Sequence, residues 1–273
     1  MSAGNGSQSE AVYTTLYRAS VLAGRPGIVV VDADAPGLDE ILGTRARSRA
    51  AIARLEKAGR LRPVRRGAYT MVDAGGNARV EVLDLVAALT PRPYAVTAGA
   101  ALQFHDLTDQ HFRLLVVLVN TQLRPWTYRG QTIRYARTTR KLAGVATRSR
   151  KTTAAIANPA RAVADSLDHP AWGVTLPQVS EATDRLLKRD PAFADKLAAE
   201  VADNYGHALA RRFGYLITAL VDADAARPFL LLRGGSKAAT KLSARGPDRG
   251  PVDTTWRVRV NVDRAVLTQH RSS

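Results

Sequence analysis

Hydrophobic and polar positions at the start of the chain alternate between helical and extended patterns. Apolar residues recur every three or four positions over residues 10–24, which predicts an amphipathic helix that ends at Gly-Arg-Pro-Gly. The apolar run at 28–31 is too short for a helix and predicts a strand. A second helix is expected over residues 36–42, with Gly43 as its end.

A third helix is predicted over residues 45–58, with Thr44 as its N-cap and Gly59 after its end. Helical spacing gives this segment two distinct faces. The residues expected to face a core are Ser48, Ala51, Ile52, Leu55 and Ala58. The opposite face carries Ala46, Ala50 and Ala53, with Arg45 and Arg49 along one border and Arg47 and Arg54 along the other.

The segment after this helix predicts a β-hairpin. Two short strands are expected within residues 60–72, around an Arg-Arg-Gly turn. Helix, strand, helix, helix and hairpin is the order of a winged helix-turn-helix. We therefore predict such a domain over residues 10–75, preceded by a flexible tail at 1–9 and ended by the Gly-rich stretch 73–79.

The rest of the chain mixes both periodicities, which predicts an α+β protein with a mixed α/β C-terminal domain over residues 76–273. Helices are expected over 80–89 and 97–105, and in the stretch 176–221, which Pro191 and Gly206 interrupt. Strands are expected at 113–119, 132–137 and 254–262.

Charge indicates the kind of partner. The formal net charge is +16 and the isoelectric point is near 10.8, which favours an anionic partner, most often nucleic acid. Arginine supplies 33 of the 40 basic residues, a usage that GC-rich coding alone can produce, so the clustering of charge is the better guide. Residues 44–72 contain nine bases and one acid, and residues 123–151 contain nine bases and no acid.

Composition also indicates the cellular compartment in which the protein is expected. The absence of cysteine excludes disulfides and thiolate metal sites and is consistent with a reducing environment. The polar start MSAGNGSQSE lacks the apolar core of a signal peptide. The longest aliphatic run, residues 114–119, is too short to cross a bilayer. We therefore expect a cytoplasmic protein with no membrane partner.

The first basic cluster predicts DNA binding through the third helix. Small alanine side chains would let the helix backbone approach base edges in the major groove, while the flanking guanidinium groups reach phosphates or guanine. One such module covers one half-site, so the expected target is a double-stranded operator with inverted repeats. The alternative is that alanine reflects helix propensity and exposed arginine keeps the surface soluble. The predicted contacts are Arg45, Arg49 and Arg54 in the groove, and Arg47, Lys57, Arg62, Arg65 and Arg66 on the DNA backbone.

A possible second basic patch follows further along the chain. Its basic residues alternate with Trp126, Tyr128 and Tyr135, whose rings could stack on bases. The patch would extend the DNA footprint or bind an acidic partner. A half-buried hairpin with a basic outer face is an equally good interpretation. The patch comprises Arg124, Arg129, Arg134, Arg137, Arg140 and Lys141.

A search for catalytic chemistry gives no strong candidate. His105 and His111 are six positions apart, which places them on different helical faces with no HExxH-like pair. Asp106 and Asp109 would complete a metal site only in a loop, so His105 is better interpreted as a packed or capping residue. The stretch 232–241 has glycines, a serine and lysines but lacks P-loop spacing. We expect no enzymatic activity, no metal and no cofactor.

Five segments that span most of the chain follow one another in a telling order. They are IARLEKAGRLRPVRRGAYTMV (52–72), YAVTAGAALQFHDLTDQ (94–110), ANPARAVADSLDHP (157–170), ALARRFGYLI (208–217) and WRVRVNV (256–262). In the order of these segments the chain resembles the AbiEi-type antitoxins, the transcriptional regulators of abortive-infection toxin–antitoxin pairs. Two departures are visible: Asp106 stands where the family often has glycine after the histidine, and residues 233–255 insert a basic loop that we expect to be mobile.

The resemblance implies an N-terminal winged helix that represses its own operon. It also implies a C-terminal domain that opposes an AbiEii-type nucleotidyltransferase toxin, either by binding it or by counteracting its effect. Two other functions stay open. One is a DNA nuclease whose active-site carboxylates lie in the C-terminal domain. Glu81 and Asp84, and Asp222 and Asp224, lie near one another in the sequence, but no lysine follows at the spacing of a common nuclease core, and solvated helix ends are the better interpretation. The other is a purely protein-binding toxin neutraliser with a vestigial winged helix.

Overall fold

A computed structural model describes residues 3–31, 43–73, 75–78, 80–142, 146–147 and 152–271. The chain divides by its internal contacts into two compact units. Unit 1 comprises Met1–Arg92, Trp126–Gly130 and Ser149–Ala154, and unit 2 comprises Pro93–Pro125, Gln131–Arg148 and Ala155–Ser273. The domain boundary expected after residue 75 falls inside unit 1. The helix expected over residues 36–42 lies outside the described residues.

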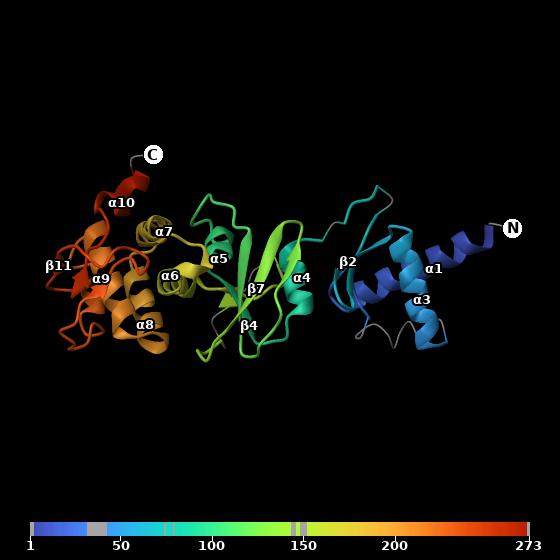
Figure 1. Ribbon diagram of the computed structural model, residues 1–273, viewed down its shortest axis with the longest axis horizontal. Coiled ribbons are helices and arrows are strands. Elements are labelled where there is room, and N and C mark those ends of the chain that lie inside the picture. The colour runs from blue at the N-terminus through green and yellow to red at the C-terminus, as the bar shows by residue number, and fades with distance from the viewer. Residues whose placement is uncertain are drawn as a thin grey trace. The chain divides into compact units, whose positions relative to one another are not determined.

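Unit 1 combines helices with a three-stranded antiparallel sheet (Figure 1). The sheet order is β1-β3-β2, so the first strand pairs with the second strand of the hairpin. The strand at 28–31 and the hairpin within 60–72 are thereby confirmed. The elements are α1 (Ala3–Leu22), β1 (Ile28–Val30), α3 (Arg45–Lys57), β2 (Leu61–Arg65), β3 (Ala68–Met71), α4 (Val82–Leu89) and β6 (Trp126–Tyr128).

The core of unit 1 forms where the apolar faces of α1 and α3 meet the sheet. Val12 and Leu16 of α1 pack in one cluster with Ile52 and Leu55 of α3 and with apolar residues of the hairpin. The predicted inward faces of both helices are therefore confirmed at these positions. Ala58, which was expected on the buried stripe, is exposed.

Helix α1 begins earlier than its sequence indicates. The tail expected over residues 1–9 is helical from Ala3 onward, which corrects that prediction. Glycines at positions 4 and 6 are poor helix formers. Extending an existing helix costs much less than starting one, and the docked turns around Val12 and Leu16 supply the nucleus.

Unit 2 contains a mixed sheet with the order β7-β5-β4-β9-β8. Its longest apolar strand, β5, runs antiparallel to β4 and parallel to β7, and five of its six residues are buried. Helix α5 (Ala98–Phe104) follows β4 directly and packs on β4 and β5. The strands are β4 (Tyr94–Thr97), β5 (Leu114–Val119), β7 (Gln131–Arg137), β8 (Ala146–Thr147) and β9 (Ile156–Ala157).

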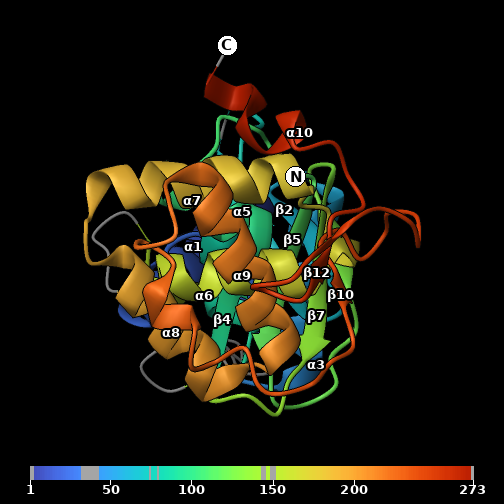
Figure 2. The same cartoon turned by 90° about the vertical axis from the view of Figure 1, so that its left-hand side faces the viewer.

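Helices make up most of the remainder of unit 2. Pro191 and Gly206 lie between successive helices, as their positions in the sequence predict. Figure 2 shows α7 crossing α9, which it contacts. Within the described chain, none of the helices is both long and apolar enough to cross a membrane. The helices are α6 (Pro159–Asp168), α7 (Leu176–Arg189), α8 (Phe193–Asn204) and α9 (His207–Leu220), with short 3-10 turns η1 (Pro170–Trp172) and η2 (Arg227–Phe229).

The C-terminal segment forms a small sheet of order β10-β12-β11. The prediction of a single strand over 254–262 is wrong. The chain turns between β11 and β12 at Trp256 and Arg257, and Arg257 has a φ of 53°. Trp256 is buried, and its indole N–H donates to the Thr218 hydroxyl at 3.0 Å, so docking of the ring interrupts the strand. The elements are β10 (Thr240–Lys241), β11 (Val252–Asp253), β12 (Val258–Arg259), α10 (Ala265–Thr268) and η3 (Gln269–Arg271).

Helix α5 ends in a left-handed residue that is not glycine. Asp106 has a φ of 56°, and its N–H donates to the Gln103 carbonyl at 3.0 Å. The N–H of Leu107 donates to the Leu102 carbonyl at 2.9 Å, and Leu107 is fully buried. Together these two hydrogen bonds form a Schellman C-cap. Aspartate adopts this conformation more readily than most residues but less readily than glycine.

We expect Asp106→Gly to raise the free energy of unfolding by about 1 kcal/mol, because glycine has no Cβ penalty in this conformation. Asp106→Ala is the matched control, since it removes the same carboxylate but keeps the Cβ. Urea denaturation of the three proteins measures the difference. Equal stability of the glycine and alanine variants would contradict a conformational origin.

Candidate functional site

Helix α3 has well-defined ends. The Thr44 hydroxyl accepts the backbone N–H of Arg47 at 3.3 Å, and the Ser48 hydroxyl donates to the Thr44 carbonyl at 3.2 Å. Beyond the other end, Gly59 has a φ of 72°, which glycine adopts without strain. These contacts confirm the predicted N-cap and the predicted end of the helix. They set where α3 begins and ends, whereas the packing of Ile52 and Leu55 in the core determines which face points outward.

The two faces of α3 differ in burial as their sequence predicts. The inward residues are almost fully enclosed, whereas the alanine strip, defined as Ala46, Ala50 and Ala53, is exposed. A helix with an exposed ridge of methyl groups can approach another surface closely. The inward residues Ser48, Ala51, Ile52 and Leu55 are between 2% and 4% exposed.

The basic side chains around the alanine strip and on the hairpin are exposed. Within the described part of the chain they form no hydrogen bond or ion pair through their charged groups. Helix α3 itself contains a single acid, Glu56. The side chain of Arg45 lies outside the described residues. The exposed set comprises Arg47, Arg49, Arg54, Lys57, Arg62 and Arg66.

Two arginines near the hairpin are engaged inside unit 1. Arg65, predicted as a DNA-backbone contact, is half-buried and donates to the Leu89 carbonyl at 2.8 Å. It ties β2 to the end of α4, so it is less available to a partner than the exposed set. Arg60 forms an ion pair with Glu10 at 2.9 Å and lies 4.0 Å from the ring centre of Tyr13. The hydrogen bond that Arg60 donates to the Glu10 carboxylate raises the pKa of Arg60.

The second basic patch separates into residues with different environments. Arg129, which belongs to unit 1, donates to the Ala78 carbonyl. Arg140 of unit 2 is half-buried and forms ion pairs with Asp165 and Asp168. Arg129 and Arg140 are therefore engaged within the protein and are excluded from the predicted basic patch. The remaining members, Arg124, Arg134, Arg137 and Lys141, are exposed and have no partner among the described residues.

The aromatic rings of this region lie inside the protein. Trp126, Tyr128 and Tyr135 are each less than 9% exposed. Stacking on a base requires an accessible ring face, so the prediction of base stacking is wrong. Burial alternates along β7, with Ile133 inward and Arg134 outward, as in an ordinary half-buried strand.

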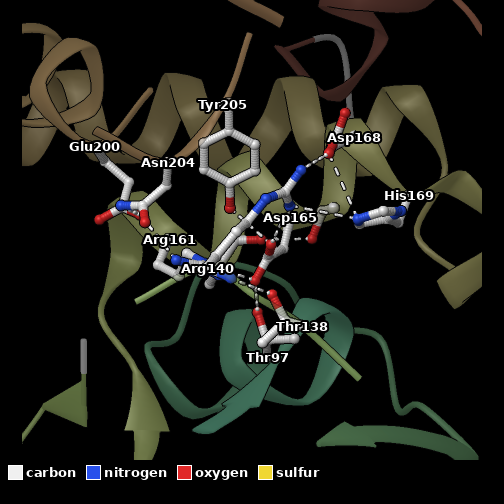
Figure 3. Close-up of polar contacts among 12 residues, drawn as sticks. Thr97, Thr138, Arg140, Arg161, Asp165, Asp168, His169, Glu200, Asn204 and Tyr205 are labelled. Atoms are coloured by element: carbon white, nitrogen blue, oxygen red, sulfur yellow. Dashed lines mark hydrogen bonds and ion pairs between the residues drawn. The ribbon is translucent and has the colours of Figure 1, made fainter. Parts of the chain in front are cut away.

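A buried carboxylate, Asp165 of α6, organises the polar interior of unit 2 (Figure 3). One of its oxygens accepts the Thr97 hydroxyl at 2.7 Å and Nε of Arg161 at 3.1 Å. The other accepts the Tyr205 hydroxyl at 2.6 Å and Nη1 of Arg140 at 3.5 Å. The side chains of Asp165 and Arg161 have no exposed surface. Both carboxylate oxygens are thus occupied by donors of the chain itself.

Most polar groups around Asp165 are also paired, although Nη2 of Arg161 is buried without a hydrogen-bond partner among the described residues. Nη2 of Arg140 donates to Asp168 at 2.6 Å, and its guanidinium lies 4.1 Å from the ring centre of Tyr205. Nη1 of Arg161 donates to Glu200 at 3.3 Å. Burial, followed by the charge of Asp165, raises the pKa of Tyr205, which keeps its hydroxyl a proton donor. This arrangement holds the fold together and leaves no carboxylate oxygen of Asp165 open for acid–base work.

The histidines do not gather into a metal site. Among the residues that the structure describes, no group of His, Asp and Glu could hold a metal ion. His105 is the C-cap of α5, with Nε2 2.8 Å from the Ala157 carbonyl, and burial lowers its pKa. The capping interpretation of His105 is confirmed. His111 instead lies with Nδ1 2.9 Å from the amide nitrogen of Gln103.

The Gly-rich stretch 232–241 is fixed by a buried guanidinium. Arg211 of α9 is 3% exposed and donates to the carbonyls of Arg233 at 2.7 Å, Ser236 at 2.8 Å and Ala238 at 2.7 Å. Three bonds from one planar donor group define the path of the loop. Arg211 therefore ties this part of residues 233–255 to α9, although the sequence predicts a mobile insertion there.

No protein-family model and no curated protein sequence matches the chain. Its structure is similar to the crystal structure of the RV2827C protein from Mycobacterium tuberculosis, with a TM-score of 0.70 over 96% of this chain and 95% of that chain. The two sequences are 14% identical, so the likeness shows a shared fold and nothing about activity.

We expect Asp165→Ala to lower the free energy of unfolding by about 3–5 kcal/mol, because it leaves the buried Arg161 with Glu200 as its remaining ion-pair partner and removes the acceptor of the Thr97 and Tyr205 hydroxyls. Thr97→Val removes one hydrogen bond and should cost about 1 kcal/mol. Urea denaturation measures both. The control is Asp203→Ala at an exposed aspartate of α8, which should change stability by less than about 0.5 kcal/mol. Similar losses in the Asp165 and Asp203 variants would contradict the central role of Asp165.

Proposed function

We propose that the protein is a sequence-specific DNA-binding repressor that serves as the antitoxin of a toxin–antitoxin pair. Unit 1 would be its winged helix-turn-helix domain. The observation that carries the proposal is the outward face of α3, where the exposed alanine strip is bordered by basic side chains without a described partner.

The order of elements in unit 1 supports a winged helix. A helix, a short strand, α3 and a hairpin follow one another, and β1 adds to the hairpin as a third strand. In this type of domain the recognition helix enters the major groove, which is about 12 Å wide. Helix α3 is suited to that position because its exposed ridge carries only methyl groups.

The basic residues fall into two expected roles. Arg49 and Arg54, joined by Arg45 from the sequence pattern, would read base edges, for which bidentate contact with guanine is the commonest form. Arg47 and Lys57 on α3 would contact phosphates. These contacts make binding depend on salt, because each neutralised phosphate releases counterions.

The hairpin would act as the wing. Arg62 and Arg66 are exposed, and Arg66 lies in the turn between β2 and β3, where it can reach a neighbouring phosphate. Arg65 would have a different role from the one its sequence suggests. Its bond to the Leu89 carbonyl positions the hairpin, so its loss would act on DNA binding indirectly.

The antitoxin role rests on the resemblance to the AbiEi family. One structural observation supports it: Asp106, which replaces a glycine common in that family, adopts the left-handed conformation that glycine favours. The expected partner is an AbiEii-type nucleotidyltransferase toxin, opposed by unit 2. The expected DNA target is the protein's own operator with inverted repeats, occupied by two protomers.

The nuclease alternative gains no support from the carboxylates of unit 2. The buried Asp165 is saturated by Thr97, Arg161, Tyr205 and Arg140. A carboxylate oxygen of Asp222 accepts the backbone N–H of Ala225. Nuclease chemistry needs carboxylates free to bind a metal ion or activate water, which Asp165 does not provide.

We expect Arg49→Ala to weaken binding to the operator by about 1–3 kcal/mol and to reduce discrimination at one base position. Competition gel shifts with single-base operator variants measure both effects. Arg18→Ala is the matched control, because it removes one exposed arginine of unit 1 that lies on α1 instead of α3. An equal loss in the two variants would indicate a general effect of charge and refute base reading by Arg49.

Arg66→Ala should weaken binding to all sequences alike and reduce the slope of log K against log salt by about 1, because it removes one phosphate contact. Titrations at several salt concentrations give the slope. An unchanged slope would remove the hairpin from the interface.

The Arg49→Ala/Arg66→Ala double variant separates regulation from antitoxin activity. We expect it to lose repression of its own promoter and still protect cells that express a cognate AbiEii-type nucleotidyltransferase, because protection is assigned to unit 2. Growth and a promoter reporter measure the two activities. Failure of the native protein to protect would refute the antitoxin role, and cleavage of operator DNA in Mg²⁺ would favour the nuclease alternative.

A further inference from the structure

Unit 2 contains a groove with an apolar floor, which no part of the proposed function uses. It lies beside the end of α6, the start of α7 and the segments around β10 and α10, and its volume is about 310 Å³. All of its lining residues belong to unit 2. Its floor consists of the buried side chains of Leu167, Val174, Val179 and Leu242.

The rim of the groove leaves apolar surface accessible. Leu176, Pro177, Val262 and Val266 line it and are only half-buried. Gly173, which also lines it, has a φ of 88°, and a Cβ there would meet no other atom, so this wall is open. The groove can therefore exchange its contents with solvent without a change of fold.

Charge in the groove has one sign. The lining includes one cation, Arg245, and no acid. The guanidinium of Arg245 is exposed and makes no hydrogen bond or ion pair with any described residue. The hydroxyl of Ser243, two positions before it, also has no partner in the described ranges. An apolar floor with two donors in the turn that follows β10 is complementary to a molecule with an apolar body and an anionic end.

We propose that this groove binds a small amphipathic carboxylate, whose apolar body lies on Leu167, Val179 and Leu242 and whose carboxylate is held by Arg245 and Ser243. The volume corresponds to about ten water molecules, which suits a ligand of the size of octanoate. Binding displaces water from apolar surface, and the arginine supplies a charge-assisted hydrogen bond.

A macromolecular occupant fits the groove less well. A stable interface between two copies buries about 800 Å² on each partner, whereas a cavity of this volume encloses one small molecule. Arg245 would repel a cation and therefore favours a carboxylate. An uncharged chain would bind more weakly, because it cannot form the charge-assisted hydrogen bond with Arg245. This inference does not depend on DNA binding, because none of the groove residues belongs to α3 or the hairpin.

Titration calorimetry of the full-length protein with octanoate, and with octanamide as its uncharged counterpart, tests the proposal. We expect saturable binding of octanoate with one site per chain and at least tenfold weaker binding of octanamide. Arg245→Ala should weaken octanoate binding about tenfold, the value of one charge-assisted hydrogen bond of roughly 1.4 kcal/mol, and leave octanamide unchanged. Arg249→Ala is the matched control, since Arg249 is an exposed arginine near Arg245 in the sequence that does not line the groove.

A second variant tests the location. Val262→Trp should fill the groove and abolish binding of both ligands, with an unchanged melting temperature as evidence that the chain still folds. Absence of octanoate binding at millimolar concentration would overturn the proposal, as would equal effects of the Arg245 and Arg249 variants. Octanoate binding that survives Val262→Trp would place the ligand elsewhere. Concentration-dependent dimerisation abolished by Val262→Trp, without octanoate binding, would identify the groove as a contact between copies.

Discussion

The carboxylate of Asp165 is the interaction on which the interior of unit 2 depends. It joins segments that are far apart in the chain: Thr97 at the end of β4, Arg140 after β7, Arg161 on α6 itself and Tyr205 after α8. Removing a charge from water is costly, so such a group is tolerated only where its donors are all in place. The four donors converge only when the sheet and the helices have assembled. The network therefore favours one arrangement of these elements over other compact ones.

Arginine has two opposite roles in this protein, and the net charge of +16 does not distinguish them. Arg161 and Arg211 are buried in unit 2, where a carboxylate and three backbone carbonyls respectively accept their hydrogen bonds. On α3 of unit 1, Arg49 and Arg54 are exposed and have no partner among the described residues. Burial and pairing, and not the number of basic residues, therefore identify the surface available to an anionic partner.

Local signals made unit 1 accessible to prediction from the sequence. Thr44, the spacing of Ile52 and Leu55, and Gly59 specify α3 within fifteen or so neighbouring residues, and short-range capping and periodicity need no tertiary information. Arg140 could not be placed in the same way. Its neighbours in the sequence match those of an exposed basic strand end, and the carboxylate that pairs with it lies 25 positions away. A local sequence pattern therefore cannot predict the role of a residue whose partners lie far away in the sequence.

The outward face of α3 is already in place before any partner binds, because local contacts hold the helix from its inner side. Ile52 and Leu55 fix the helix on the core of unit 1, and the bond from Arg65 to the Leu89 carbonyl fixes β2 against α4. Both elements are thus held by contacts on their inner sides, while their outer sides contribute little to folding. A partner that binds such a surface orders only side chains and not backbone, which lowers the entropy that binding must overcome. For this reason, removal of an exposed arginine should change the affinity for a partner while leaving the stability of unit 1 almost unchanged.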